Sequence, residues 1–168
     1  MRKSDAIAML FFLGCLGGCK AGNAPVGNAS TISAATSLIS AAVKATEVRD
    51  LSALERLRGN AGLTLQWISW EQRGILEVSQ RGDVVHLKGT QGTAGGNGRL
   101  EMEGDVLSID SGHFIFRGTI KINDTPDAGR SCVKDDDSEF AITQSRKYWR
   151  MREFEWCDGL TDYIDIYF

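Results

Sequence analysis

The chain has 168 residues, 42% hydrophobic and 24% charged, which is enough for one folded domain with its own core. Its formal net charge is −3, from 19 basic and 22 acidic side chains. Because a nucleic-acid-binding surface needs a basic excess, we expect no nucleic-acid partner.

Residues 1–18 have the composition of a signal peptide. Arg2 and Lys3 make the start basic, and the apolar run from Ala6 to Leu16 is too short to span a membrane. The run ends in Leu16-Gly17-Gly18-Cys19, which resembles the bacterial lipobox. This resemblance implies cleavage before Cys19 and attachment of acyl chains such as palmitate to that cysteine. A plain secretory signal, cleaved further along, is the alternative.

The lipobox resemblance also implies a location in the cell envelope. Cys19 is followed by Lys20 and not by aspartate, which by the same resemblance favours the outer membrane, facing the periplasm, if the source has two membranes. Two or more acyl chains hold a protein stably at a bilayer. The first expected partner is therefore the membrane itself, through an N-terminal lipid anchor.

The chain contains four cysteines, of which two remain for the mature domain. Cys15 leaves with the signal peptide and Cys19 carries the lipid, so Cys132 and Cys157 are left. Two cysteines in an oxidising compartment predict one disulfide. A redox pair or a metal site is the alternative, but neither a Cys-x-x-Cys spacing nor a neighbouring histidine supports it.

The chain after the signal divides into a tether, a helical segment and a β-domain. Residues 19–31 are rich in Ala, Gly, Asn and Ser and predict a flexible tether. Residues 32–59 predict one or two short helices, the second opened by the capping-box spacing of Ser52 and Glu55 and stopped by Gly59.

Residues 60–168 change from helical spacing to an alternation of period two, which predicts strands. Long loops are expected at residues 89–98, where glycine dominates, and at 124–137, which hold three consecutive aspartates. Short connections without intervening helices predict an antiparallel meander, folded as a small lipocalin-like barrel or a two-sheet sandwich. The strands are expected at residues 63–67, 75–79, 84–88, 99–103, 105–110, 113–123, 139–143, 147–156 and 162–168.

The last two expected strands carry the candidate binding face. Alternation buries Trp149 and Met151 in one strand and Ile164 and Ile166 in the other, and turns their neighbours, including Asp165, outward. The candidate binding face consists of Tyr148, Arg150, Arg152, Tyr163 and Tyr167.

Two interpretations of this face remain open. Arginines flanked by rings can bind a planar or anionic ligand. Alternatively, Arg150 and Arg152 form ordinary cross-strand ion pairs with Asp162 or Asp165.

The chain shows no catalytic motif. Asp110, Ser111 and His113 are neighbours in sequence, but adjacency does not assemble a catalytic triad, and no G-x-S-x-G is present. The acidic loop at 124–137 lacks the spacing of a calcium loop. We therefore expect a non-enzymatic protein without a metal or other cofactor.

A block near the C-terminus resembles the signature of small uncharacterised bacterial lipoproteins. The block is Tyr148-Trp149-Arg150, then Cys157, then Asp162-Tyr163-Ile164-Asp165. The resemblance covers residues 62–168 and implies no assigned activity. The leading hypothesis is a binding or structural module of the envelope with a protein partner. The alternatives are a lipocalin-like carrier of a small apolar ligand and an inhibitor of an envelope-directed enzyme.

Overall fold

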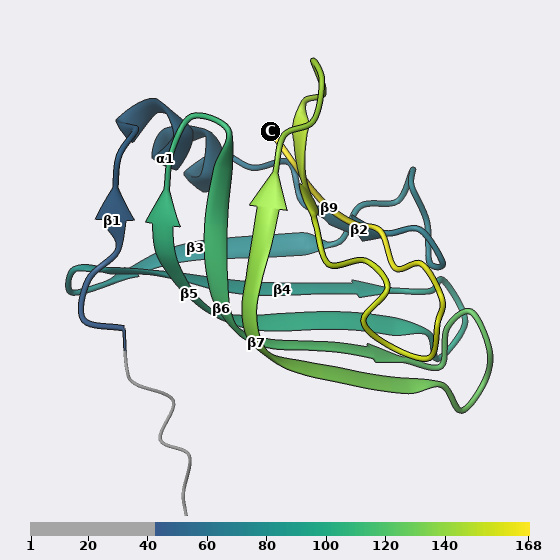
Figure 1. Ribbon diagram of the computed structural model, residues 1–168. Helices are drawn as coiled ribbons and strands as arrows, with labels where there is room; N and C mark the ends of the chain where they lie inside the picture. Colours follow the sequence, from purple (N-terminus) through teal and green to yellow (C-terminus); the bar gives the residue numbers. More distant parts are fainter. Residues whose placement is uncertain (1–42) are drawn as a thin grey trace, which may run out of the picture. The chain divides into compact units, whose positions relative to one another are not determined.

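The computed structural model describes residues 43–168, which form one helix and nine strands (Figure 1). The signal peptide, Cys19, the tether and most of the first expected helix lie outside the described residues. Among residues 43–168, no helix has the length and apolar character that crossing a bilayer requires. The elements are β1 (Glu47–Val48), α1 (Leu51–Arg58), β2 (Leu63–Leu65), β3 (Ile75–Arg81), β4 (Val84–Gly92), β5 (Arg99–Ile109), β6 (His113–Asn123), β7 (Ser131–Ala141), β8 (Tyr148–Met151) and β9 (Ile164–Tyr167).

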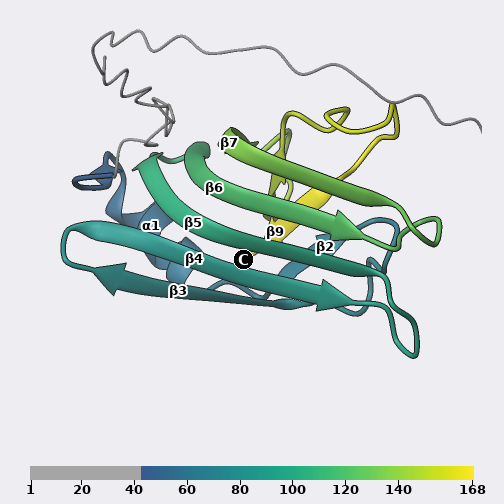
Figure 2. The same ribbon diagram turned by 90° about the horizontal axis from the view of Figure 1, so that it is seen from below.

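Eight strands form one sheet in the order β2-β9-β8-β7-β6-β5-β4-β3, and β1 pairs in parallel with the end of β5. Every neighbouring pair along this order is antiparallel. A two-residue bridge between Leu63 and Gly74 joins β2 to the start of β3, so the sheet curls into a nearly closed barrel (Figures 1 and 2). The predicted antiparallel β meander is confirmed, in its barrel form and not as a sandwich.

Where the two ends of the sheet meet, one buried amide side chain of β4 bonds to β2 and to the segment between β2 and β3. Gln91 is 3% exposed and accepts a hydrogen bond from the Leu65 amide at 2.6 Å. Its own amide nitrogen donates to the carbonyls of Ser69, at 2.9 Å, and Gln72, at 2.7 Å. Gln91 thereby supplies partners to backbone groups that a missing strand would otherwise satisfy.

Two glycines face each other on β5 and β6. Gly104 lies directly opposite Gly118. A Cβ atom on Gly104 would collide with the Arg117 carbonyl oxygen, and one on Gly118 with the Glu103 carbonyl oxygen. The ring of Phe116 occupies the space that both side chains would need. Glycine at these positions is therefore a packing requirement.

Helix α1 contributes apolar side chains to the barrel core. Ala53, Leu54 and Leu57 join the same apolar cluster as the inward-facing strand residues, whereas Leu51 is exposed. The helix lies on the concave side of the bent sheet (Figures 1 and 2). Its N-cap is Asp50, which accepts from the amides of Ser52 and Ala53, so the predicted capping box at Ser52 is wrong.

Strand β7 is the largest correction to the predicted elements. It spans Ser131–Ala141 and includes the three aspartates that were expected in a loop. Along its full length it pairs with β6, where Arg117 binds Asp137 and Thr119 binds Asp135. These cross-strand partners on the outer face allow acidic residues to occupy a strand that their composition disfavours.

Other bounds also differ from expectation, including those of β2, β3 and β9, and β1 was not expected. The segments expected at 99–103 and 105–110 form the single strand β5, and β4 extends into the glycine-rich loop as far as Gly92. Strand β8 stops at Met151, five residues before the expected end. Beyond Met151 the chain leaves the sheet and carries Cys157 toward β7.

Candidate functional site

The candidate binding face is centred on Arg150 of β8, which lies opposite Asp165 of β9. The guanidinium donates Nε to Oδ1 and Nη2 to Oδ2 of Asp165, both at 2.7 Å. This bidentate pair raises the pKa of Arg150. Burial raises the pKa of Asp165, and the hydrogen bonds from Arg150 oppose that rise. The expected cross-strand ion pair is therefore present for Arg150.

Three aromatic rings surround the Arg150 guanidinium. Its central carbon lies 4.1 Å from the ring centre of Tyr163, 5.3 Å from Tyr148 and 5.6 Å from Trp70. The side chain of Arg150 is 15% exposed and that of Asp165 is 1% exposed. These distances suit cation–π attraction. Arg150 is thus largely buried beneath the three rings, and its contacts with them fix their positions.

Two more arginines stack at the edge of the same rings. Arg73 lies 4.0 Å from the ring centre of Tyr167, and Arg146 lies 5.6 Å from that of Tyr148. Tyr148 and Tyr167 are themselves in contact, with centroids 5.2 Å apart. The arginine–aromatic surface consists of Trp70, Arg73, Arg146, Tyr148, Arg150, Tyr163 and Tyr167.

The structure brings together four of the five predicted residues of the binding face. Arg152 is the exception, since it follows the end of β8, is exposed, and stacks on no ring among the described residues. Asp165, expected to face solvent, is buried because its carboxylate pairs with the ring-surrounded Arg150.

Sequence reasoning missed Trp70 and Arg73, which lie some 80 residues before β8. They precede β3, and they reach the face only because β2 pairs with β9. Their one sequence signal is Trp70, an aromatic residue beyond the end of an alternating strand.

The edge of the arginine–aromatic surface is basic on a chain whose net charge is negative. Arg150 is neutralised by Asp165, whereas Arg73 and Arg146 have no ion-pair partner within residues 43–168. Trp70 is 42% exposed, and the three tyrosines are half-buried. The surface therefore offers flat apolar rings and unneutralised positive charge, which suits an anionic ligand.

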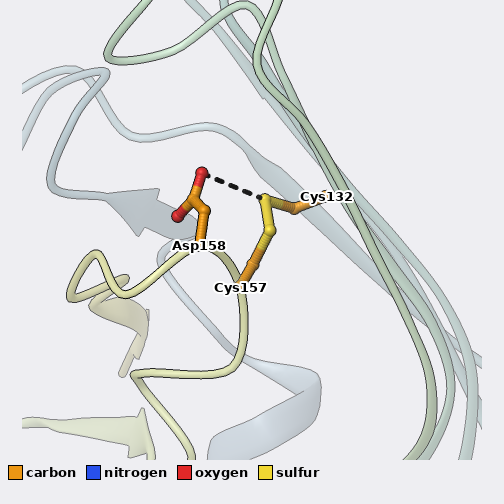
Figure 3. Close-up of side chains that lie close together, drawn as sticks. All are labelled: Cys132, Cys157 and Asp158. Atoms are coloured by element: carbon orange, nitrogen blue, oxygen red, sulfur yellow. Dashed lines mark hydrogen bonds between the residues drawn. A yellow bond between two sulfur atoms is a disulfide. The ribbon is translucent and has the colours of Figure 1, made fainter.

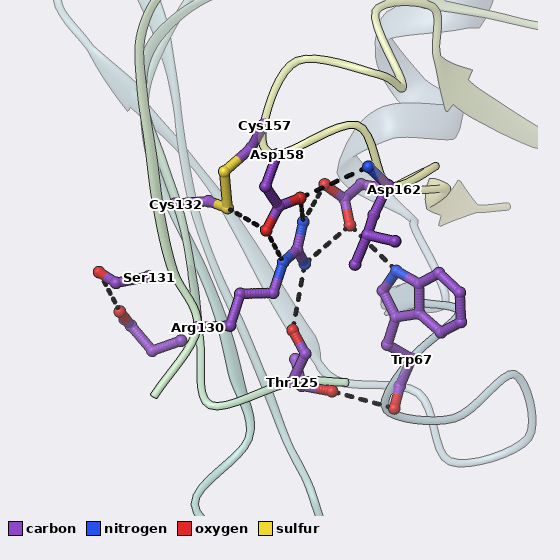
Figure 4. The surroundings of a disulfide bond; sticks show 10 residues. Trp67, Thr125, Arg130, Ser131, Cys132, Cys157, Asp158 and Asp162 are labelled. Carbon is purple, nitrogen blue, oxygen red and sulfur yellow. Dashed lines mark hydrogen bonds and ion pairs between the residues drawn. A yellow bond between two sulfur atoms is a disulfide. The ribbon is translucent and has the colours of Figure 1, made fainter. Parts of the chain in front are cut away.

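A second polar cluster lies beside the disulfide and joins Arg130, the residue before β7, to the segment that follows β8 (Figure 4). The guanidinium of Arg130 donates to both oxygens of Asp158, at 2.8 and 2.9 Å, and to both oxygens of Asp162, at 3.0 and 2.9 Å. Asp162 also accepts from the indole of Trp67 at 3.0 Å. Arg130 holds the pKa of Asp158 below its ordinary value by this hydrogen bonding. Asp162, a predicted partner of the β8 arginines, instead belongs to Arg130.

The disulfide between Cys132 and Cys157 joins β7 to the segment after β8, with 6.0 Å between the Cα atoms. Figure 3 shows Asp158 beside the two sulfurs. These three residues form the one metal-type cluster among the described residues, with ligand atoms within 4.8 Å of one another. Because the sulfurs are bonded to each other and Asp158 is bound by Arg130, the cluster has no thiolate to offer a metal.

We expect the Cys132→Ser/Cys157→Ser double variant to lose about 3 kcal/mol of unfolding free energy, since the disulfide closes a loop of 25 residues. Urea unfolding measures this loss. Reductant should shift the wild-type curve in the same direction and leave that of the double variant unchanged. A double variant as stable as the wild type would contradict the structural role of the bond.

The model of the PM1083 family matches residues 45–168 of the chain. The uncharacterized protein PM1083 of Pasteurella multocida (strain Pm70) is 36% identical over 115 residues, covering 67% of this chain and 74% of that protein. No solved structure matches the chain. The matched region includes the whole barrel, the disulfide and the arginine–aromatic surface, and the chain therefore belongs to the PM1083 family.

Proposed function

We propose that the protein is a non-enzymatic, lipid-anchored component of the cell envelope that binds an anionic partner through the arginine–aromatic surface. The observation that carries the binding proposal is the group of half-exposed rings edged by arginines that lack ion-pair partners in the described part of the chain. The anchor is supported by the sequence Leu16-Gly17-Gly18-Cys19 after a basic start and an apolar run.

The lipocalin-like carrier is less well supported, because the barrel interior is filled by large side chains. Phe114 and Phe140 stack at 5.0 Å, and Trp149 packs edge-on against Phe114 at 5.7 Å. Phe168 lies 4.3 Å from Trp149, and all the larger strand residues of this cluster are fully buried. Rings in mutual contact occupy the volume that an apolar ligand would need. No specific observation on the described residues favours an enzyme inhibitor.

The binding proposal is tested with the full chain and dextran sulfate, a polyanion, with neutral dextran as the reference. We expect salt-sensitive binding to dextran sulfate alone. The Arg73→Gln/Arg146→Gln variant should bind about fivefold more weakly, since each charge at the edge of the rings contributes about 0.5 kcal/mol. Fluorescence anisotropy of labelled dextran sulfate measures both affinities.

The matched control removes two positive charges elsewhere, in Lys44→Gln/Arg81→Gln. Both side chains are exposed and have no ion-pair partner among residues 43–168. The control should stay within about twofold of the wild type, because these charges lie away from the rings. An equal loss in both double variants would show that net charge alone governs binding and would refute the proposed surface.

A further inference from the structure

A solvent-open cavity of about 550 Å³ lies on the outer face of β3, β4, β5 and β6 and shares no residue with the arginine–aromatic surface. Figure 2 shows that these strands turn this face away from α1. Cavities of this size hold small organic ligands or short peptides.

The charges that line this cavity are balanced, with three acidic and three basic side chains. Four of them pair within the wall: Lys88 Nζ lies 3.2 Å from Glu103, and Arg99 Nη1 lies 3.8 Å from Glu101. Glu77 of β3 and Lys121 of β6 are left without an ion-pair partner among the described residues. Glu77 and Lys121, on the two outermost strands of the cavity, are therefore its two charges that form no ion pair, although each lies opposite a residue of the other charge, Lys88 and Glu101.

The register of the sheet sets the distance between these two charges. In the strand register, Glu77 lies opposite Lys88, Lys88 opposite Glu103, and Glu101 opposite Lys121. Glu77 and Lys121 are therefore separated by three strand spacings across the sheet and by two residues along a strand. Strand spacings of about 4.8 Å and a rise of about 3.3 Å per residue place the two Cα positions roughly 16 Å apart. An extended peptide of about four or five residues spans this length.

The remaining walls suit a peptide backbone. Thr90 and Thr119 offer hydroxyl groups, which can donate to peptide carbonyls and accept from peptide amides. Ile75 is 66% exposed at the edge of the cavity and supplies an apolar contact for a small side chain. A polyanion would meet the carboxylates of Glu77, Glu101 and Glu103, so this cavity and the arginine–aromatic surface select different ligands.

We propose that this cavity binds a short extended peptide with free ends, its ammonium at Glu77 and its carboxylate at Lys121. The length of the peptide follows from the charge separation, and its direction across the strands follows from the order of the two charges. This site is independent of the proposed anionic partner and remains valid if that partner is refuted.

The test uses the full chain and four forms of tetra-alanine in isothermal titration: free, N-acetylated, C-amidated and doubly capped. We expect each cap to weaken binding about fivefold, the upper range for an exposed charge pair. In Glu77→Gln, N-acetylation of the peptide should no longer weaken binding, whereas C-amidation should still weaken it. In Lys121→Gln we expect the reverse, so that each variant and the matching peptide modification form an independent double-mutant cycle.

Glu155→Gln and Lys44→Gln, which change exposed charges outside the cavity, serve as controls and should retain both cap effects. All four substitutions are at exposed positions, so folding is preserved. Equal affinity for free and capped peptides would overturn the proposal. So would the absence of saturable binding, or cap effects that persist in both cavity variants.

Discussion

Replacing Arg130 with alanine is expected to lower the free energy of unfolding by about 3–5 kcal/mol, the usual loss when one partner of a buried ion pair is removed. The side chain of Arg130 is 4% exposed and that of Asp162 is 0% exposed. Without the guanidinium, Asp162 keeps only the indole of Trp67 as a side-chain partner. Urea unfolding at pH 7 measures the loss.

Arg117→Ala is the matched control, because Arg117 forms the same kind of bidentate pair with Asp137 at 34% and 46% exposure. Its loss should stay below about 1 kcal/mol, as for exposed ion pairs. Similar losses in the two variants would contradict the assignment of the Arg130 cluster as the polar support of the segment after β8.

The Arg130 effect should also depend on pH. Arg130 lowers the pKa of Asp158 by hydrogen bonding, so the folded carboxyl ionises more readily than the unfolded one. The stability gained in this way is complete above the unfolded pKa of about 3.9 and is lost as the pH falls through the lower folded pKa. The difference between wild type and Arg130→Ala should therefore shrink below about pH 4.

Replacing Trp149 with alanine is expected to cost about 3–5 kcal/mol, because a large buried ring leaves a cavity that the barrel cannot fill. Trp149 is 0% exposed and contacts the rings of Phe114 and Phe168. Trp70→Ala, at a tryptophan 42% exposed, is the matched control and should cost less than about 1 kcal/mol. Thermal or urea unfolding distinguishes the two.

The same pair of variants tests the filled interior. The wild type and Trp70→Ala should not bind an apolar fluorescent dye, whereas Trp149→Ala should, if it remains folded. Dye binding by the wild type at a site inside the barrel would revive the carrier hypothesis, and a small loss of stability in Trp149→Ala would contradict the packed core.

Local alternation predicted the strands with the clearest apolar pattern. Strand β6 has the bounds expected from Phe114, Phe116, Ile120 and Ile122, all buried on one face. Only the end of β7 was expected as a strand; residues 131–138 were missed because their aspartates read as a solvated loop, and their partners on β6 make them compatible with a strand. The helix cap was misplaced because Ser52 and Asp50 are both good caps, and it is Asp50 whose side chain accepts from the first amides of α1.

The candidate site was predictable only as far as neighbouring strands could be paired. Tyr148, Arg150, Tyr163 and Tyr167 follow from alternation in the last two strands. Trp70 and Arg73 do not, because their approach depends on the closure of the barrel between β2 and β9. The same holds for Arg130, whose partners lie 28 and 32 residues away along the chain.

The central proposal is a lipid-anchored envelope protein, and intact-mass spectrometry of the mature protein from its producing cells tests it most directly. We expect a chain that begins at Cys19 with attached acyl chains, and a gain of two hydrogen atoms on reduction of the Cys132–Cys157 bond. A mature chain with a different, unacylated first residue would contradict the proposed lipid anchor.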